Sequence, residues 1–279
     1  MTPNPQIELT AAYWTLSGRF PGIEPEYSRF NFKDRVEAAS KAGFSGLGIW
    51  HADLDHILER RTLLEMRQIL DDNGMNVEVE FLTDWFLEGE RRKQSDLRRQ
   101  KLLAAAEALR AKQIKVGDFY NEKCPMPRLI DAFASLCKEA AEYGTRVAFE
   151  PMAVSMVHTL EESLEMVRSS GATNAGIVLD IWHMVNLNIP YAEISRFPAQ
   201  FLLGAEVNDA VFSREGKPEV DRRFCGEGEF DIQGFIQAVQ QTGYSGPWGI
   251  ELFSRQLMDD TLESMTTRAF RTTRQQFFS

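Results

Sequence analysis

Two hydrophobic patterns alternate along the chain. Short runs rich in β-branched and aromatic residues each lead, through a polar loop, into a longer segment in which apolar residues recur every three or four positions. The short runs are typical of β-strands and the longer segments of amphipathic helices. The predicted strands cover residues 7–14, 46–50, 76–82, 113–119, 146–150, 176–180, 202–207 and 248–252.

Capping and stop signals place helices between these strands. Thr159 and Glu162 have the spacing of a capping box, and glycine follows several of the helical segments. Ser95 and Asp96 are suited to begin another helix, whose apolar stripe includes Leu97. The predicted helices cover residues 32–42, 58–72, 95–111, 126–143, 159–170, 191–196, 231–242 and 259–277.

Eight strand–helix units follow one another without a low-complexity linker, which predicts an α/β fold with parallel strands. Eight units are the number required for a closed (β/α)8 TIM barrel, and barrels of about 250 residues form one domain. We therefore expect a single barrel domain over residues 1–279. A doubly wound sheet is the alternative, but the glycine-rich phosphate turns GxGxxG and GxxxxGK[ST] are absent from the sequence.

Composition and charge narrow the choice of partners. The 279 residues are 43% hydrophobic and carry a formal net charge of −10, which opposes non-specific binding to nucleic acid or to an anionic membrane. Three widely spaced cysteines without a CxxC motif argue against a disulfide framework or a thiolate metal site. The N-terminus lacks the pattern of a signal peptide, and no run approaches the roughly 20 apolar residues that span a bilayer. We expect a soluble, cytoplasmic protein with no nucleic-acid or membrane partner.

Acidic residues stand at the carboxyl ends of several predicted strands, which is where barrel enzymes place their active sites. Because these ends meet at one face of a barrel, the acids of strands five to eight would converge on one point. Two histidines, His51 and His183, follow the second and sixth strands. The strand-end acids are Glu80, Glu150, Asp180, Glu206 and Glu251.

Mutual repulsion is the chemical consequence of such a cluster. Carboxylates within a few ångströms of one another cannot all remain ionised unless they are protonated, paired with bases or bridged by a cation. Lys115 and the Arg222-Arg223 pair are the candidate bases. A divalent cation is the simpler solution, because Mg²⁺ and Mn²⁺ prefer oxygen ligands. A single strand-end acid is more often a cap, a salt bridge or a solvated group, so the prediction depends on recurrence at successive strands.

Aromatic residues near strand ends are a second candidate feature. They could form the wall of a sugar-binding pocket, although core packing explains each of them at least as well. His51 is equally ambiguous, since it either reaches the site or lies beside it. The aromatic residues are Trp14, Trp50, Phe81, Trp85 and Trp182.

Together these motifs resemble the xylose-isomerase-like (β/α)8 superfamily of sugar isomerases and epimerases, which also includes inosose dehydratase and endonuclease IV. The resemblance extends from KDRVEAASKAGFSGLGIW (33–50) to GYSGPWGIELF (243–253). The motifs that carry it are AFEP, LDIWH, GAEVND, RRFCGEGEFD and GIEL. It implies one divalent cation, Mn²⁺ or Mg²⁺, whose ligands would be Glu150, Asp180, Glu206 and Glu251.

The resemblance also implies roles for individual side chains. Glu150 and Glu251 would form the acid/base pair, while His183 and Arg222 would hold substrate oxygens. The chain departs from the family at Glu206, where relatives have histidine. An all-carboxylate shell would favour hard cations over Zn²⁺, and Glu206 could alternatively bind substrate. The remaining candidates for substrate binding are Glu80, His51, Lys115, Trp14 and Asn208.

The implied reaction is removal of a proton next to a ketone through an enediolate. It predicts an isomerase or epimerase of a small carbohydrate substrate, a neutral keto-sugar or cyclitol. Loss of a β-hydroxyl from the same enediolate would instead give a dehydratase or lyase, including one that cleaves 3-keto-glycosides, and a non-catalytic sugar-binding barrel is a further alternative. The acidic turn CGEGEFD disfavours phosphorylated sugars, and four histidines with a net charge of −10 disfavour a DNA-repair endonuclease. The aromatic C-terminus RQQFFS (274–279) is a candidate contact for a homo-oligomer.

Overall fold

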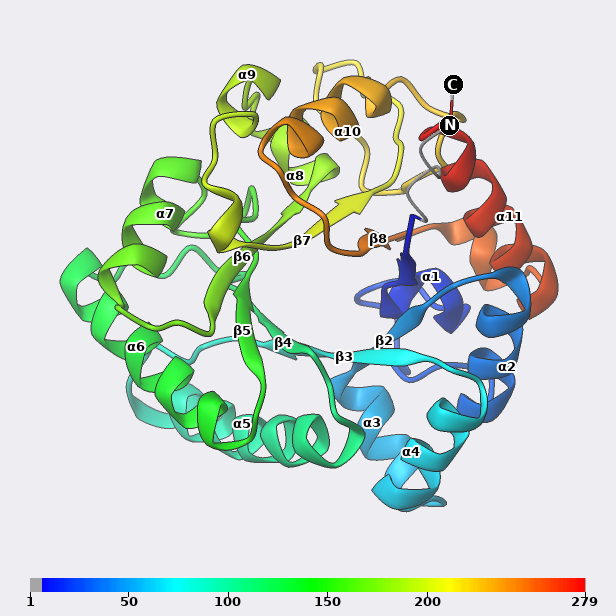
Figure 1. The fold of residues 1–279 in the computed structure, drawn as a ribbon, viewed down its shortest axis with the longest axis horizontal. Helices are drawn as coiled ribbons and strands as arrows, with labels where there is room; N and C mark the ends of the chain where they lie inside the picture. The colour runs from blue at the N-terminus through cyan, green and yellow to red at the C-terminus, as the bar shows by residue number, and fades with distance from the viewer. Residues whose placement is uncertain (1–6, 279) are drawn as a thin grey trace.

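The computed structural model describes residues 7–278 and confirms the (β/α)8 barrel. Within these residues, eight parallel strands follow one another in sequence order around the barrel, and β8 pairs with β1 to close it. Figure 1 shows the helices as an outer layer around the strands. The strands are β1 (Leu9–Ala11), β2 (Gly46–Trp50), β3 (Asn76–Leu82), β4 (Gln113–Val116), β5 (Arg146–Phe149), β6 (Ala175–Asp180), β7 (Leu202–Val207) and β8 (Trp248–Ile250).

The helices include every predicted one and three that the hydrophobic pattern missed. The three, α1, α3 and α8, each start one or two residues after a strand, so they lie at the carboxyl end of the barrel. The helices are α1 (Tyr13–Ser17), α2 (Phe32–Ala42), α3 (His51–Leu58), α4 (Leu63–Asp72), α5 (Gly89–Leu109), α6 (Met126–Glu142), α7 (Leu160–Ser169), α8 (Ile181–Asn186), α9 (Tyr191–Ile194), α10 (Ile232–Gln241) and α11 (Leu262–Gln275).

Two predicted boundaries are wrong because a helix begins where the apolar run continues. The first strand ends at Ala11 rather than at residue 14, and the chain turns into α1 two residues later. The helix predicted over residues 58–72 corresponds to α4, which begins only at Leu63, because residues 51–58 form the separate helix α3. Thr62 caps α4: it accepts a hydrogen bond from the Glu65 amide, and the Glu65 side chain accepts one from the Thr62 amide. This capping box restarts the helix.

The prediction that Ser95 begins a helix is also wrong. Helix α5 starts at Gly89, so Ser95 lies inside it and its hydroxyl donates to the carbonyl of Thr83 at 2.6 Å. Leu97, predicted to lie in the apolar stripe, is 57% exposed. The later part of the stripe is correct, because Leu102, among others, is buried against the strands. The capping box predicted at Thr159 and Glu162 is confirmed.

The core has three parts. The largest lies between the strands and the outer helices, as expected for a barrel surrounded by helices, and a second consists of Tyr13, Trp14, Trp50, Phe81 and Met152. Inside the barrel a small cluster consists of Ala148, Val178 and Leu203. Ala148 and Val178 precede Glu150 and Asp180 by two residues, so strand alternation places each of these pairs on the same face of its strand. The apolar cluster therefore forms the floor beneath the acidic end of the barrel.

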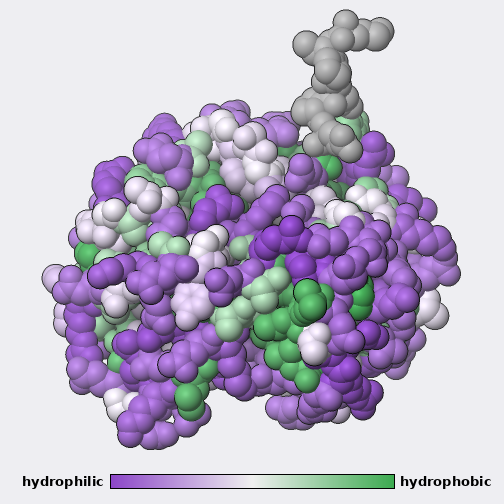
Figure 2. Space-filling model, turned by 60° about the horizontal axis from the view of Figure 1, so that its bottom comes forward, coloured by the Kyte–Doolittle hydropathy of each residue, from purple (hydrophilic) through white to green (hydrophobic). Residues whose placement is uncertain are grey.

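The face of the molecule drawn in Figure 2 is largely hydrophilic. Figure 2 shows one face on which polar side chains surround a compact group of hydrophobic ones. Along the described part of the chain, no helix has the length and hydrophobicity needed to cross a membrane. Near the C-terminus, Phe277 packs against Trp248 and Phe278 is 46% exposed. Residues 1–6, which belong to the segment considered above as a signal peptide, and Ser279 lie outside the described residues.

Candidate active site at the carboxyl end of the barrel

The five strand-end carboxylates lie together at the carboxyl end of the barrel. They come from five different strands: β3 and β7 contain Glu80 and Glu206, Asp180 ends β6, and Glu150 and Glu251 directly follow β5 and β8. All five are buried, with exposed fractions of 0–5%. The four acids of strands five to eight each offer an oxygen that lies within 4.8 Å of the others. The predicted convergence is therefore present in the structure.

Lys115 lies at the centre of this cluster. It belongs to β4 and is 1% exposed. Its Nζ donates to Oε1 of Glu206 at 2.7 Å and lies 3.5 Å from Oε2 of Glu80 and 3.9 Å from Oε1 of Glu251. Although burial opposes its charge, Glu206 and the other carboxylates hold the pKa of Lys115 well above its ordinary value. The lysine is therefore a cation in this site.

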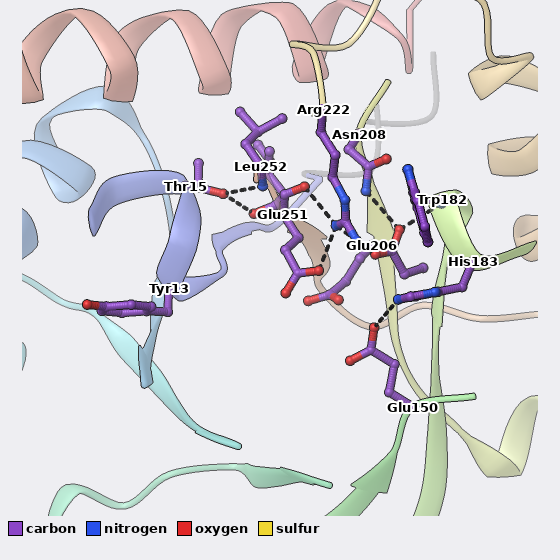
Figure 3. Close-up of polar contacts among 12 residues, drawn as sticks. Tyr13, Thr15, Glu150, Trp182, His183, Glu206, Asn208, Arg222, Glu251 and Leu252 are labelled. Atoms are coloured by element: carbon purple, nitrogen blue, oxygen red, sulfur yellow. Dashed lines mark hydrogen bonds and ion pairs between the residues drawn. The ribbon is translucent and has the colours of Figure 1, made fainter. Parts of the chain in front are cut away.

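Arg222 supplies the second buried cation. Its Nη1 lies 2.9 Å from Oδ2 of Asp180 and donates to Oε2 of Glu251 at 2.7 Å, and Figure 3 shows its side chain reaching between β7 and β8. Its guanidinium also lies over the ring of Phe253, 4.0 Å from the centroid. Arg222 thus fixes the two carboxylates relative to each other. Nearby, Thr15 of α1 bonds to the backbone of Ile250 and Leu252, the neighbours of Glu251.

The cations do not balance the acids. Five buried carboxylates face two buried cations, Lys115 and Arg222, which would leave three excess negative charges if every acid were ionised. Burial, and then the charge of Glu251, raises the pKa of Glu150 well above its ordinary value. Burial raises the pKa of Glu206 as well, against the pull of Lys115, and raises that of Glu80 to about 7. The site accordingly favours bound protons or a bound cation.

Two glycines make room for the side chains of Glu206 and Glu80. A Cβ on Gly249 would lie 2.6 Å from Cγ and 2.8 Å from Oε1 of Glu206, and a Cβ on Gly48 would overlap the carboxylate of Glu80. Neither glycine has a positive φ, so their role is to allow this close approach. The Glu80 carboxylate in turn accepts a hydrogen bond from the backbone amide of Tyr13 at 3.1 Å.

His183 is held as a neutral donor beside Glu150. The amide of Ala153 donates to its Nδ1 at 3.2 Å, and its Nε2 lies 3.5 Å from Oε1 of Glu150, toward which the ring points in Figure 3. Burial, and then Arg222, lowers the pKa of His183 to about 3. With Nδ1 accepting, the neutral ring carries its proton on Nε2. An N–H donor therefore faces Glu150 and the cavity.

An aromatic cavity of about 360 Å³ opens above the acids. The predicted aromatics Trp14, Trp50, Phe81 and Trp182 all line it, together with Phe119 and Phe253, which carried no signal in the sequence. Trp85 does not, since it packs against Phe86 and Phe133. The acidic and basic lining residues are Glu26, Glu80, Glu150, His183, Arg222 and Glu251.

Three predicted substrate-binding residues, His51, Lys115 and Asn208, are not among the residues that line this cavity. His51 begins α3 and lines a separate cavity between α3 and α5, with its ring 4.8 Å from that of Trp50. His51 directly follows β2, as the sequence predicts, but it lies at this separate cavity and not among the acids. Asn208 is fully buried and donates from Nδ2 to Oδ1 of Asp180 at 2.8 Å. It therefore positions Asp180 rather than lining the cavity.

The donor set fits a hard divalent cation. The grouped acids offer only oxygen ligands, and Oε2 of Glu206 is buried without a hydrogen-bond partner. Such an orphan acceptor is costly unless something binds it. A second grouping, of Glu150, Asp180 and His183, would add one nitrogen ligand. Both groupings include Glu150 and Asp180.

The family follows from a match over most of the chain. The sequence model of the xylose isomerase-like TIM barrel family matches residues 36–275, and the protein belongs to that family. Family membership establishes the fold, whereas the particular reaction has to be argued from the residues of the site.

Three similar proteins indicate the range of that family. The 3-dehydroshikimate dehydratase of Pseudomonas aeruginosa is 27% identical over 85% of this chain, which spans 37% of the dehydratase's length. The inosose isomerase of Bacillus subtilis is 24% identical over 52% of the chain and 53% of its own length. The IOLI protein, solved with a binding zinc atom, has a TM-score of 0.85 at 18% identity, covering 97% of this chain and 98% of its own. The curated relatives are thus enzymes, and this chain spans only about a third to a half of their length.

Proposed function

We propose that this protein is a divalent-metal-dependent isomerase or epimerase that removes the proton next to the carbonyl of a neutral keto-sugar or cyclitol. The observation that carries the proposal is the pair Glu150 and Glu251, which line one cavity and have carboxylate oxygens within 4.8 Å of each other. Two carboxylates at one reacting centre can serve as base and acid in turn. The similarity to an inosose isomerase supports this reaction class.

Four residues would hold the cation: Glu150, Asp180, Glu206 and Glu251. Their oxygen-only donor set favours Mg²⁺ or Mn²⁺. When bound, such an ion stabilises the negative charge that develops on the substrate oxygens as the proton leaves. Lys115 and Arg222 place further positive charge around the same carboxylates.

The side chains of this chain would divide the proton transfers between them. One of Glu150 and Glu251 takes the proton from the carbon next to the carbonyl, and the other returns one to the opposite face. The raised pKa of Glu150 suits it to carry a proton near neutral pH. His183 donates its Nε2–H to a substrate oxygen, and Arg222 keeps Glu251 oriented through its hydrogen bond.

The cavity favours a neutral substrate. Among the described lining residues, Arg222 is the one cation, and it is already engaged by Asp180 and Glu251. No free basic group is therefore available there for a carboxylate or phosphate. Aromatic walls such as Trp14 and Trp182 suit the C–H faces of a sugar or cyclitol ring.

Dehydration is the second candidate, favoured by the dehydratase relative that matches 85% of the chain. The enediolate would then expel its β-hydroxyl as water, with the proton supplied by the carboxylic acid that formed when Glu150 or Glu251 took the proton from carbon. The Nε2–H of His183, beside Glu150, would hydrogen-bond to the leaving oxygen. The same base is used in both reactions, and they differ in the fate of the intermediate.

Proton exchange tests the proposal. Keto-sugars and cyclitol ketones are incubated in deuterated water with protein that has been stripped by chelator and then supplied with Mn²⁺ or Mg²⁺. We expect deuterium at the carbon next to the carbonyl, with an epimer or isomer as product; an unsaturated product of lower mass would instead establish dehydration. Glu150→Gln and Glu251→Gln should each abolish exchange, whereas the exposed control Glu107→Gln should not. Full exchange in both variants, or exchange that needs no metal, would overturn the proposal.

A further inference from the structure

A second cavity, of about 330 Å³, lies outside the active site. One side is formed by the loop between α1 and α2, residues 18–31, with the first residue of α2. The other side is formed by α3 and the residues that follow it. The lining includes Arg19, Tyr27, Arg29, His56, Arg60 and Arg61.

Positive charge accumulates in this cavity although the chain carries a net charge of −10. Four arginines line it. The one acid that lines it, Asp53, is buried and paired with the equally buried Arg35, so it does not offset the arginines. At its edge Glu59 lies 3.4 Å from Nδ1 of His56. Within residues 7–278, no acidic side chain forms an ion pair with any of the four arginines.

Two of the arginines are fixed and two are available. Arg29 donates to the carbonyls of Met258 and Asp260, and Nε of Arg19 donates to the carbonyl of Tyr27 at 3.1 Å. These bonds to neutral carbonyls hold the guanidinium groups without cancelling their charge. By contrast, the side chains of Arg60 and Arg61 have no hydrogen-bond or ion-pair partner in the described part of the chain. The cavity thus combines preorganised positive charge with donors that are free to bind.

We propose that this cavity binds a multiply charged oxyanion, such as the phosphate of a small ester or a polycarboxylate. Guanidinium groups bind such anions through paired, charge-assisted hydrogen bonds. The stacked rings of Tyr27 and His56, with centroids 3.9 Å apart and planes at 12°, give the site one flat wall. The ligand differs in charge from the neutral substrate proposed for the active cavity, so the two sites are chemically distinct.

The position of the cavity connects it to the active site through one loop. Pro21 and Glu26 of the 18–31 loop line the active cavity, while Tyr27 and Ser28 line the basic one. The amide of Ser28 donates to Oδ1 of Asp53 at 2.9 Å, and the hydroxyl of Tyr13 donates to the carbonyl of Glu26 at 2.8 Å. An anion that draws Arg19 and Arg61 together across the cavity would stabilise this loop.

Binding is measured by titration calorimetry with chelator-treated protein at constant ionic strength. Inorganic phosphate, pyrophosphate and citrate are the probes, so that phosphoryl and carboxylate ligands are distinguished. We expect saturable binding of at least one probe, weakened on the order of tenfold or more in R60A/R61A. The control R168A/R271A removes two exposed arginines from α7 and α11 with the same change in net charge, and it should bind as the parent does. Absence of saturable binding, or equal weakening in both double variants, would overturn the proposal.

Hydrogen exchange locates the bound anion. With the tightest of the three probes, amides of residues 26–31 should exchange more slowly in the parent protein and in the control, but not in R60A/R61A. Protection confined to the strand ends that carry Glu150 and Glu251 would place the anion in the active cavity and contradict the proposal. Failure of the sugar exchange assay would leave this outcome untouched, since the anion site shares no charged lining residue with the active cavity.

Discussion

Lys115 and Glu206 form a buried ion pair across the barrel, with Nζ 2.7 Å from Oε1. The two residues belong to β4 and β7 and are 1% and 2% exposed. Glu206 is the position at which the family resemblance leads us to expect histidine in relatives. A glutamate there would add a charge to an already acidic cluster, and Lys115 supplies the compensating one. The lysine thus explains how a buried glutamate is tolerated at this position, and it leaves Oε2 of Glu206 free for a cation.

Replacing Lys115 by methionine should strongly destabilise the metal-free protein. Glu206 would remain buried without its partner, and breaking a buried ion pair from one side costs about 3–5 kcal/mol. Urea unfolding in the presence of chelator measures the loss. The double variant K115M/E206M should recover most of it, because both charges are then absent. If the two single variants and the double variant are additive, the pair makes no specific contribution.

Gly249→Ala should disturb the site through Glu206. The new methyl would lie 2.6 Å from Cγ of Glu206, whose carboxylate is held by Lys115 and cannot move without breaking that bond. We expect a loss of about 1–3 kcal/mol in stability, together with weaker metal binding. Gly204→Ala is the matched control inside the same barrel, since its methyl would meet Val178 at 3.2 Å and no charged group. Equal effects of both substitutions would show that only general packing is affected.

The sequence predicted the barrel well because strand periodicity and the helix stop signals are local properties. All eight strands were located, and β2, β3 and β7 were placed to the residue. The errors fall at the carboxyl end, where α1, α3 and α8 follow a strand within two residues. There no glycine or proline separates the strand from the helix. The misplacement of His51 has this cause, because the start of α3 sets its direction.

The acidic residues of the site could be predicted from their positions at strand ends, but the groups that pair with them could not. Strand alternation and register bring Asp180 opposite Glu206 and Glu206 opposite Gly249, which are properties of any closed parallel barrel. Lys115 and Glu206 belong to β4 and β7, which are separated by two strands, so their pairing depends on side-chain reach across the interior. Likewise the amide of Tyr13 that binds Glu80 comes from a helix that the sequence pattern did not reveal. Contacts of this kind need the folded geometry.

The stability of the metal-free protein should fall as pH rises through the range in which Glu80 ionises. The pKa of Glu80 is raised from 4.5 to about 7, chiefly by burial, so the folded state holds its proton more tightly than the unfolded state does. The stabilisation is complete below about pH 4.5 and is lost by about pH 7, an effect on the order of 3 kcal/mol. Glu150 and Glu206 shift in the same direction. Thermal unfolding between pH 5 and 8 should show a smaller decline for Glu80→Gln; an unchanged decline would assign the titration to other groups.

Substitution of Glu206 tests whether it is a metal ligand or only a partner of Lys115. If Oε2 binds the cation, Glu206→Gln should weaken Mn²⁺ binding at least tenfold, because an amide oxygen carries no charge. Introducing histidine with removal of the lysine, E206H/K115M, should shift preference from Mn²⁺ toward Zn²⁺ by a similar factor, since imidazole is the softer ligand. Competitive titration of the chelator-treated proteins with both metals measures the ratio, and K115M alone is the control for the lysine. A Mn²⁺ affinity unchanged in Glu206→Gln would mean that Glu150, Asp180 and Glu251, or the grouping with His183, hold the ion without it.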